Sequence, residues 1–241
     1  MSFFSLANQG VQLLEPYTPG KPIDELEREL GIQNIVKLAS NENPLGVSPK
    51  ALAAMQSMIN AVNIYPDGNG YRLKKALVEK FGVNIEGITL GNGSNDILEL
   101  VVRGFVSEKD EVVISQHAFA VYHLASQSVN ATIHTVPAKN YGCDLDAMRD
   151  AITQKTKVVF LTNPNNPTGT WFSQGDFERF MEKAPKNVLV VLDEAYCEYI
   201  DEPSFPNGLD YISHYENLIV TRTFSKIYGL AGLRVGYSVS H

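Results

Sequence analysis

The segment Val188-Leu189-Val190-Val191-Leu192, followed at once by Asp193-Glu194-Ala195-Tyr196, decides the fold class. Its first five residues are wholly apolar, as expected of a buried strand. Helical periodicity separates the earlier runs of this kind, near residues 95–106, 119–128, 144–152 and 173–184. Strands that alternate with helices predict an α/β fold, with a mostly parallel sheet covered by helices on both faces. The other strand candidates are Ile88–Leu90, Val112–Ile114, Thr132–Val136, Val158–Leu161 and Leu218–Val220.

Capping signals predict where several helices begin and end. Ser173 and Asp176 have the spacing of a capping box. Pro49, directly after a serine, predicts a helix start, and Gly82 predicts the end of the next helix. The charged stretch at residues 23–30 is also helix-like.

Composition and charge favour small-molecule chemistry. The chain has 241 residues, enough for one large α/β domain or for one domain and part of another. Its net charge of −7 argues against a nucleic-acid partner, which usually requires clustered Lys and Arg. Cys143 and Cys197 are far apart, which fits a reducing compartment and predicts a cytoplasmic protein. We expect no membrane partner, because no apolar run approaches the length of a membrane span.

Two motifs follow predicted strands, where ligands bind in sheets of this kind. Gly91-Asn92-Gly93-Ser94-Asn95-Asp96 precedes a helix, so its backbone N–H groups can form an anion site; a plain helix cap is the alternative. Thr162 to Gly169 contains two Asn-Pro pairs, and its alternative reading is a proline-rich turn. Within it, Asn166 can donate to a ligand oxygen.

Two further motifs supply charge. Asp193 closes an apolar strand, so a cationic or N–H partner is needed to keep it ionised; a structural ion pair is the alternative. Lys226 lies in Thr223-Phe224-Ser225-Lys226-Ile227-Tyr228-Gly229, followed by Arg234. Its apolar neighbours suit a desolvated, nucleophilic amine, and a solvated lysine beside a strand is the alternative. Thr223, Ser225 and Arg234 together suit a phosphate group.

Pyridoxal phosphate chemistry uses all four motifs: a lysine Schiff base, a carboxylate opposite the pyridinium nitrogen, an amide near the ring oxygen and a phosphate cradle. The four motifs in this order resemble fold-type I pyridoxal-phosphate aminotransferases. Leu38 to Pro44, Tyr65-Pro66-Asp67-Gly68 and Leu14 to Gly20 are similar, within that class, to the histidinol-phosphate aminotransferases. The resemblance covers essentially the whole chain and implies a sheet of about seven strands.

The resemblance also implies roles for individual residues. Lys226 would form the Schiff base and move the proton during transamination, while Asp193 would keep the pyridinium nitrogen protonated. Asn166 and Tyr196 would bond the phenolic oxygen of the ring, and Phe119 would stack on it, where many relatives have tyrosine. The cofactor phosphate would be held by Gly93, Ser94, Asn95, Thr223, Ser225 and Arg234.

The same resemblance implies a shared site and a domain division. Tyr65 would reach the phosphate bound by the other subunit of a homodimer, and Tyr17 and Asn43 would lie on the substrate side. Residues 1–43 would be an N-terminal arm with a substrate-side loop, and residues 44–241 the cofactor-binding large domain. Relatives continue into a small C-terminal domain. We therefore expect this form to be a truncation with little or no transaminase activity, which steady turnover would refute.

The implied reaction moves the amino group of L-histidinol phosphate to 2-oxoglutarate, giving imidazole acetol phosphate and L-glutamate in histidine biosynthesis. The alternatives are another class II aminotransferase, a phospho-amino-acid decarboxylase, or an inactive cofactor-binding fragment. A metal hydrolase fits poorly, because the five histidines show no ligand spacing, and we expect no metal. A dinucleotide-binding enzyme also fits poorly, because Gly91-Asn92-Gly93 lacks the third glycine of that motif.

Overall fold

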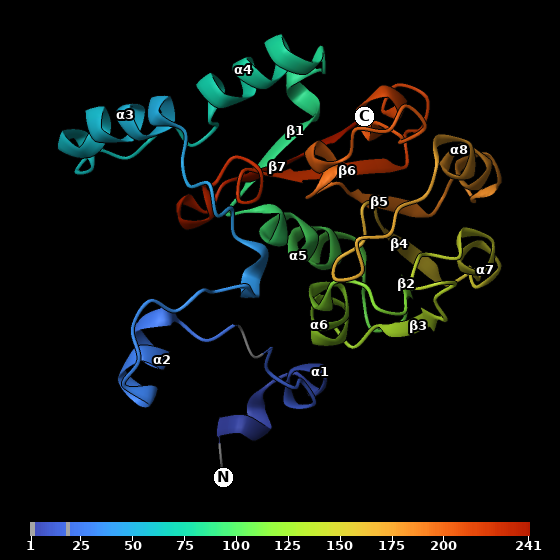
Figure 1. Ribbon diagram of the computed structural model, residues 1–241. Coiled ribbons are helices and arrows are strands. Elements are labelled where there is room, and N and C mark those ends of the chain that lie inside the picture. Colours follow the sequence, from blue (N-terminus) through green and yellow to red (C-terminus); the bar gives the residue numbers. More distant parts are fainter. Residues whose placement is uncertain (1–2, 18–19) are drawn as a thin grey trace.

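A seven-stranded sheet forms the centre of the computed structural model, which describes residues 3–17 and 20–241 (Figure 1). The strand order is β1-β7-β6-β5-β4-β2-β3. β7 runs antiparallel to both of its neighbours, and the other adjacent pairs are parallel. The predicted α/β fold with a mostly parallel sheet is therefore confirmed. The strands are β1 (Ile88–Gly91), β2 (Glu111–Ser115), β3 (Thr132–Val136), β4 (Thr156–Thr162), β5 (Leu189–Asp193), β6 (Leu218–Thr223) and β7 (Gly236–Ser240).

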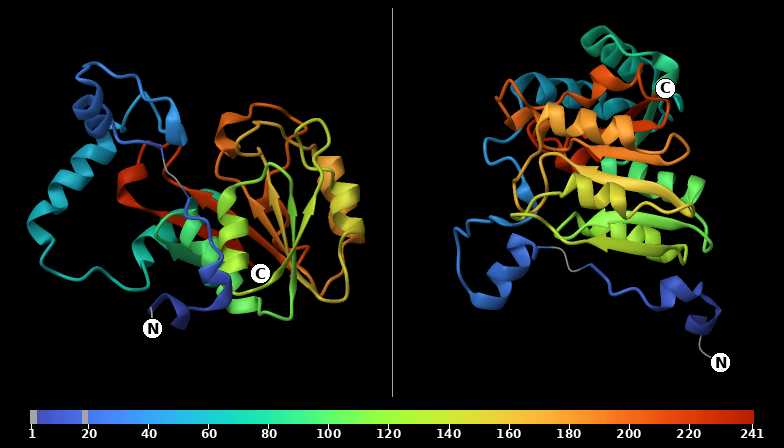
Figure 2. Two further views of the ribbon diagram at one scale, coloured as in Figure 1. Left: turned by 90° about the horizontal axis from the view of Figure 1, so that it is seen from below. Right: turned by 90° about the vertical axis from the view of Figure 1, so that its right-hand side faces the viewer.

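Helices cover both faces of this sheet (Figure 2). Side chains of α5 and α6 pack on one face, and those of α4, α7 and α8 belong to the core on the other. Successive strand residues alternate between the two cores: Val158 and Phe160 face α5 and α6, whereas Val159 faces the opposite core. The helices are α1 (Gln9–Gln12), α2 (Ile23–Leu30), α3 (Pro49–Met58), α4 (Tyr71–Phe81), α5 (Ser94–Phe105), α6 (Ala120–Ser128), α7 (Leu145–Asp150) and α8 (Gln174–Lys183).

The helix ends largely match the capping signals. Ser173 and Asp176 form a reciprocal capping box at the start of α8. Gly82 ends α4 in the left-handed conformation, with φ of 68°. Pro49 occupies the first turn of α3, but Ser48 makes no side-chain hydrogen bond to that turn. Sequence periodicity did not identify β7, which lies between β1 and β6 and pairs antiparallel with both.

The N-terminal segment rests on α6 and leaves many apolar side chains exposed. The Gln127 side chain donates to the Leu13 carbonyl at 2.9 Å, which ties the residues after α1 to α6. Phe3 and Val36 are 89% and 80% exposed. Thr18 and Pro19, which belong to one of the family-like motifs, lie outside the described residues. Among the described helices, none has both the length and the hydrophobicity that a bilayer-spanning helix requires.

A buried ion pair links β5 to β6 just beside the end of the sheet. Arg222 donates from Nε and Nη2 to Glu194 Oε2 at 2.9 and 2.7 Å, and the Gly208 N–H donates to Glu194 Oε1 at 2.6 Å. Glu194 is fully buried, and Arg222 is 6% exposed. The guanidinium also lies over the Phe81 ring, 5.3 Å from its centroid. Of the two adjacent carboxylates, Glu194 is thus the one with the structural ion pair.

Replacing Glu194 by Gln should destabilise the chain strongly, because it leaves the Arg222 charge buried without a counter-ion. We expect a loss of about 3–5 kcal/mol in the free energy of unfolding, measured by urea denaturation. Glu79→Gln, in the exposed pair with Lys75, is the matched control and should leave the midpoint unchanged. Equal midpoints for the two variants would contradict this account.

Candidate active site

A pocket of about 450 Å³ opens at the carboxyl ends of β4, β5 and β6, beside the first turn of α5. Parallel strands end at the same edge of the sheet, so residues distant in the sequence meet there. The structure brings together eleven of the predicted site residues in the wall of this pocket. They are Gly93, Ser94, Asn95, Phe119, Asn166, Asp193, Tyr196, Thr223, Ser225, Lys226 and Arg234.

Lys226 lies half-buried in the pocket, in the loop that follows β6. Its Nζ donates to the Ser40 carbonyl at 2.9 Å and lies 5.4 Å from the centroid of the Tyr196 ring. Burial lowers the pKa of Lys226, and the nearby Glu42 carboxylate opposes that effect. A lysine with a lowered pKa is a better nucleophile at neutral pH, and the nucleophilic role of Lys226 stays a prediction.

Asp193 ends β5 at the floor of the pocket and is only 2% exposed. The Tyr122 hydroxyl donates to Asp193 Oδ2 at 2.7 Å, and the Ala195 N–H donates to Oδ1 at 3.2 Å. Burial raises the pKa of Asp193, whereas these donors and the charge of Lys226 oppose the rise. Asp193 is therefore a carboxylate held by neutral donors and suited to a cationic N–H in the pocket.

The opposite end of the pocket is an anion cradle. Gly93, with φ of 87°, precedes α5 and offers no side-chain cap, so the first N–H groups of this helix have no capping acceptor. A Cβ at Gly93 would lie 2.6 Å from Arg234 Nη2, and the φ of 87° would strain any residue with a side chain. Arg234 Nη1 also lies 3.5 Å from Ser225 Oγ. The positive end of the α5 dipole, the Arg234 guanidinium and the Ser225 hydroxyl thus lie at the same place, an arrangement that suits a phosphate group.

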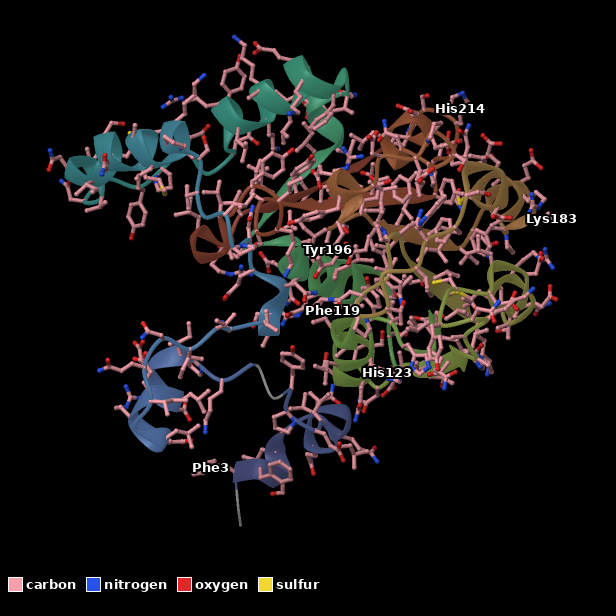
Figure 3. All side chains as sticks on the ribbon, in the orientation of Figure 1. Phe3, Phe119, His123, Lys183, Tyr196 and His214 are labelled. Carbon is pink, nitrogen blue, oxygen red and sulfur yellow. The ribbon has the colours of Figure 1, made fainter. Side chains whose placement is uncertain are left out.

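Aromatic and amide side chains form the walls between these two ends. Phe119 and Tyr196 lie at the same edge of the sheet, near α5 (Figure 3). The Asn41 side chain donates to the Tyr196 hydroxyl at 3.0 Å, and Asn166 lies half-buried in the pocket wall. The pocket thus combines a carboxylate, an anion cradle and aromatic side chains, which fits a flat ring that carries a phosphate.

Three predicted residues lie outside this wall. Tyr65 is 98% exposed on this chain, and Tyr17 lines a neighbouring hollow together with Phe119 and Asn95. Asn43 donates to the Ile227 carbonyl at 2.7 Å, so it fixes the 39–43 loop beside the lysine. Their roles toward a substrate or a second subunit stay predictions.

The structure adds residues that the sequence interpretation did not assign to the site. Ser40 and Glu42 line the pocket, although their motif was recognised. Thr162 also lines it, at the end of β4, where it pairs in register with Asp193. Its place directly after an apolar run was a usable signal. Tyr122, one helical turn after Phe119, lies behind the wall, and its i, i+3 spacing could have indicated that contact.

A second hollow of about 460 Å³ adjoins the first and shares Thr162 with it. Its charged lining includes Arg179, which is paired with Asp176. It contains no residue of the predicted site, and we therefore assign the chemistry to the pocket with Lys226. Within residues 3–17 and 20–241, no cluster of three or more His, Cys, Asp or Glu side chains is arranged to hold a metal ion.

Comparison with known proteins gives a consistent assignment. Residues 33–241 match the family model described as aminotransferase class I and II. A protein named histidinol-phosphate aminotransferase 2 from Pseudomonas fluorescens strain Pf-5 is 58% identical over 240 residues, which cover 99% of this chain and 65% of that protein. A similarly named protein from Pseudomonas aeruginosa is 57% identical, with the same coverage. The chain thus spans about two thirds of the length of these relatives.

Solved structures agree with this assignment. The structure of histidinol-phosphate aminotransferase from Sinorhizobium meliloti in complex with pyridoxal 5'-phosphate superposes with a TM-score of 0.88 and 31% identity, covering 96% of this chain and 62% of that one. L-threonine-O-3-phosphate decarboxylase from Porphyromonas gingivalis, at 23% identity and a TM-score of 0.75, shares the fold. On the family match and the 58% identity together, the chain belongs to the class I and II aminotransferase family.

Proposed function

We propose that this chain binds pyridoxal phosphate and supplies the cofactor site for transamination between L-histidinol phosphate and 2-oxoglutarate, a reaction that gives imidazole acetol phosphate and L-glutamate. The observation that carries the proposal is one pocket that contains the Lys226 amine, the Asp193 carboxylate and the anion cradle around Arg234. The names of the most similar relatives and the cofactor in the Sinorhizobium meliloti structure support the same substrate and cofactor.

Each end of the pocket holds one part of the cofactor. Arg234, Thr223, Ser225 and the first N–H groups of α5, all at the pocket, would bind the phosphate, and Asp193 would accept a hydrogen bond from the protonated ring nitrogen. Phe119 covers one face of the ring. When bound, pyridoxal phosphate supplies an electron sink for the bonds at the substrate Cα.

The remaining residues handle the amine, the ring oxygen and the proton. Lys226 would be the residue that attaches the cofactor, and its Nζ would hold the proton removed from the substrate Cα. Its lowered pKa favours this role, because it increases the fraction of the amine that is unprotonated at a given pH. Tyr196 and Asn166 orient the ring by hydrogen bonds to its phenolic oxygen, with Asn41 already holding the Tyr196 hydroxyl.

The site is completed by a second copy of the chain. The apolar side chains exposed on α3 and on the arm, residues 1–43, fit burial against a partner. Leu52 and Met58 are 48% and 54% exposed on α3, and Tyr65 is 98% exposed. In the homodimer, Tyr65 reaches the phosphate bound by the partner, while Tyr17 and Asn43 lie on the substrate side.

Arg234→Met should weaken binding of pyridoxal phosphate by about 10- to 100-fold, because it removes a charge-assisted contact to the phosphate. Binding of pyridoxal, which has no phosphate, should change far less. Both dissociation constants are measured by titrating the absorption of the bound cofactor. Arg103→Met, on the exposed face of α5, is the matched control. Equal weakening of both ligands by Arg234→Met would place the phosphate elsewhere.

Histidinol phosphate should bleach the visible band of the bound cofactor and yield pyridoxamine phosphate, detected by mass spectrometry. L-aspartate and O-phospho-L-threonine should leave the band intact. Lys226→Ala should abolish the response, whereas Lys139→Ala, in the second hollow, should retain it. A Lys226-dependent band that responds to another amine, and not to histidinol phosphate, would assign a different substrate.

Mixing Lys226→Ala and Tyr65→Phe chains tests the shared site. In a mixed dimer one site receives Lys226 from one subunit and Tyr65 from the other, so about a quarter of all sites should regain tight cofactor binding. In the control experiment, a Tyr71→Phe chain takes the place of the Tyr65→Phe chain, because Tyr71 is also exposed. This control chain should bind the cofactor tightly before mixing. If mixing restores no tight sites, Tyr65 does not act across a dimer interface.

A further inference from the structure

Tyr122 of α6 is fully buried behind the pocket, between two polar partners. Its hydroxyl donates to Asp193 Oδ2 at 2.7 Å and lies 2.8 Å from Thr162 Oγ1. Thr162 and Asp193 are register partners in the β4–β5 pair, so neighbouring strands hold both groups. The tyrosine hydroxyl thus joins a helix to the ends of two strands.

The direction of these hydrogen bonds follows from the single proton of the phenol. Burial, with the added effect of the Asp193 charge, raises the pKa of Tyr122 well above its usual value, so the phenol keeps its proton. That proton goes to Asp193, and the Thr162 hydroxyl therefore donates to the Tyr122 oxygen. The result is a directed chain from Thr162 through Tyr122 to Asp193.

The ring of Tyr122 is fixed as firmly as its hydroxyl. It stacks on Phe160 of β4, with ring centroids 4.7 Å apart and planes 8° apart. It also meets Phe119 edge to face, at 5.9 Å and 88°. One side chain therefore contacts both the carboxylate at the pocket floor and the aromatic residue in the pocket wall.

We propose that Tyr122 is a positioning residue that holds the Asp193 carboxylate, and with it the ring of Phe119, in the geometry that binds the cofactor ring. The inference rests on the proposed function and extends it to a residue that does not line the pocket. Tyr122 acts only through Asp193 and Phe119, and Thr162 supports it from β4.

The hydroxyl also affects the charge of Asp193. Three titratable groups of the described chain face this carboxylate: Tyr122 on α6, Lys226 after β6 and Tyr196 after β5. The hydrogen bond from Tyr122 favours the ionised form and so opposes the effect of burial. Removing the hydroxyl should therefore raise the pKa of Asp193, and its negative charge should be lost at a higher pH.

Tyr122→Phe tests this role because it removes the hydroxyl and keeps the ring. The dissociation constant of pyridoxal phosphate should rise about tenfold at neutral pH. In a series of titrations across pH, the acid limb, where affinity is lost as the pH falls, should move to higher pH. Tyr211→Phe is the matched control, because Tyr211 also donates to a carboxylate at 2.7 Å, that of Glu178, away from the pocket.

Thr162→Val is the second variant, and it should move the acid limb in the same direction by a smaller amount. If Tyr122→Phe fails to fold, an unmoved limb in Thr162→Val overturns the inference. The inference is also overturned if Tyr122→Phe weakens cofactor binding equally at every pH, without movement of the acid limb. It is overturned as well if Tyr122→Phe and Tyr211→Phe change cofactor binding by the same amount. A wild-type chain with no Lys226-dependent cofactor band overturns the proposed function and this inference together.

Discussion

The charge on Asp193 is the constraint on which the site depends. A carboxylate with 2% exposure loses most of its hydration, so it stays ionised only where donors are built around it. The structure supplies the Tyr122 hydroxyl and the Ala195 N–H, but no cation among residues 3–17 and 20–241 is bonded directly to it. The missing positive partner is the reason that a protonated ring nitrogen fits this position. The helices that cover the sheet keep water away from the end of β5. The same burial therefore makes Asp193 a carboxylate that needs a positive partner in the pocket.

Glu194, the next residue, is also a buried carboxylate, but its charge is balanced in a different way. It is paired with Arg222 and accepts a third bond from the Gly208 N–H. Its charge is satisfied within the protein and is not available to a ligand. Because successive strand residues point to opposite faces, one dipeptide supplies both a structural ion pair and a carboxylate for the pocket.

The sequence predicted the sheet because its strands are short apolar runs, and it predicted the pocket because polar motifs follow those runs. β7 was missed because Gly236–Ser240 alternates glycine and serine with larger residues, and its burial comes from pairing with β1 and β6. The hydrogen bonds of the Tyr122 hydroxyl to Thr162 and Asp193 could not be predicted, since they depend on how α6 packs on the sheet. The exposed Tyr65 was assigned by resemblance, and one chain alone does not test that role.

The most direct test of the central claim is to locate the covalent bond between protein and cofactor. The chain is mixed with pyridoxal phosphate, reduced with borohydride and digested, and the modified lysine is identified by mass spectrometry. This account predicts that the cofactor is found on Lys226, and that Asp193→Asn markedly lowers the yield. Modification spread over several exposed lysines, or concentrated on one outside the pocket, would contradict it.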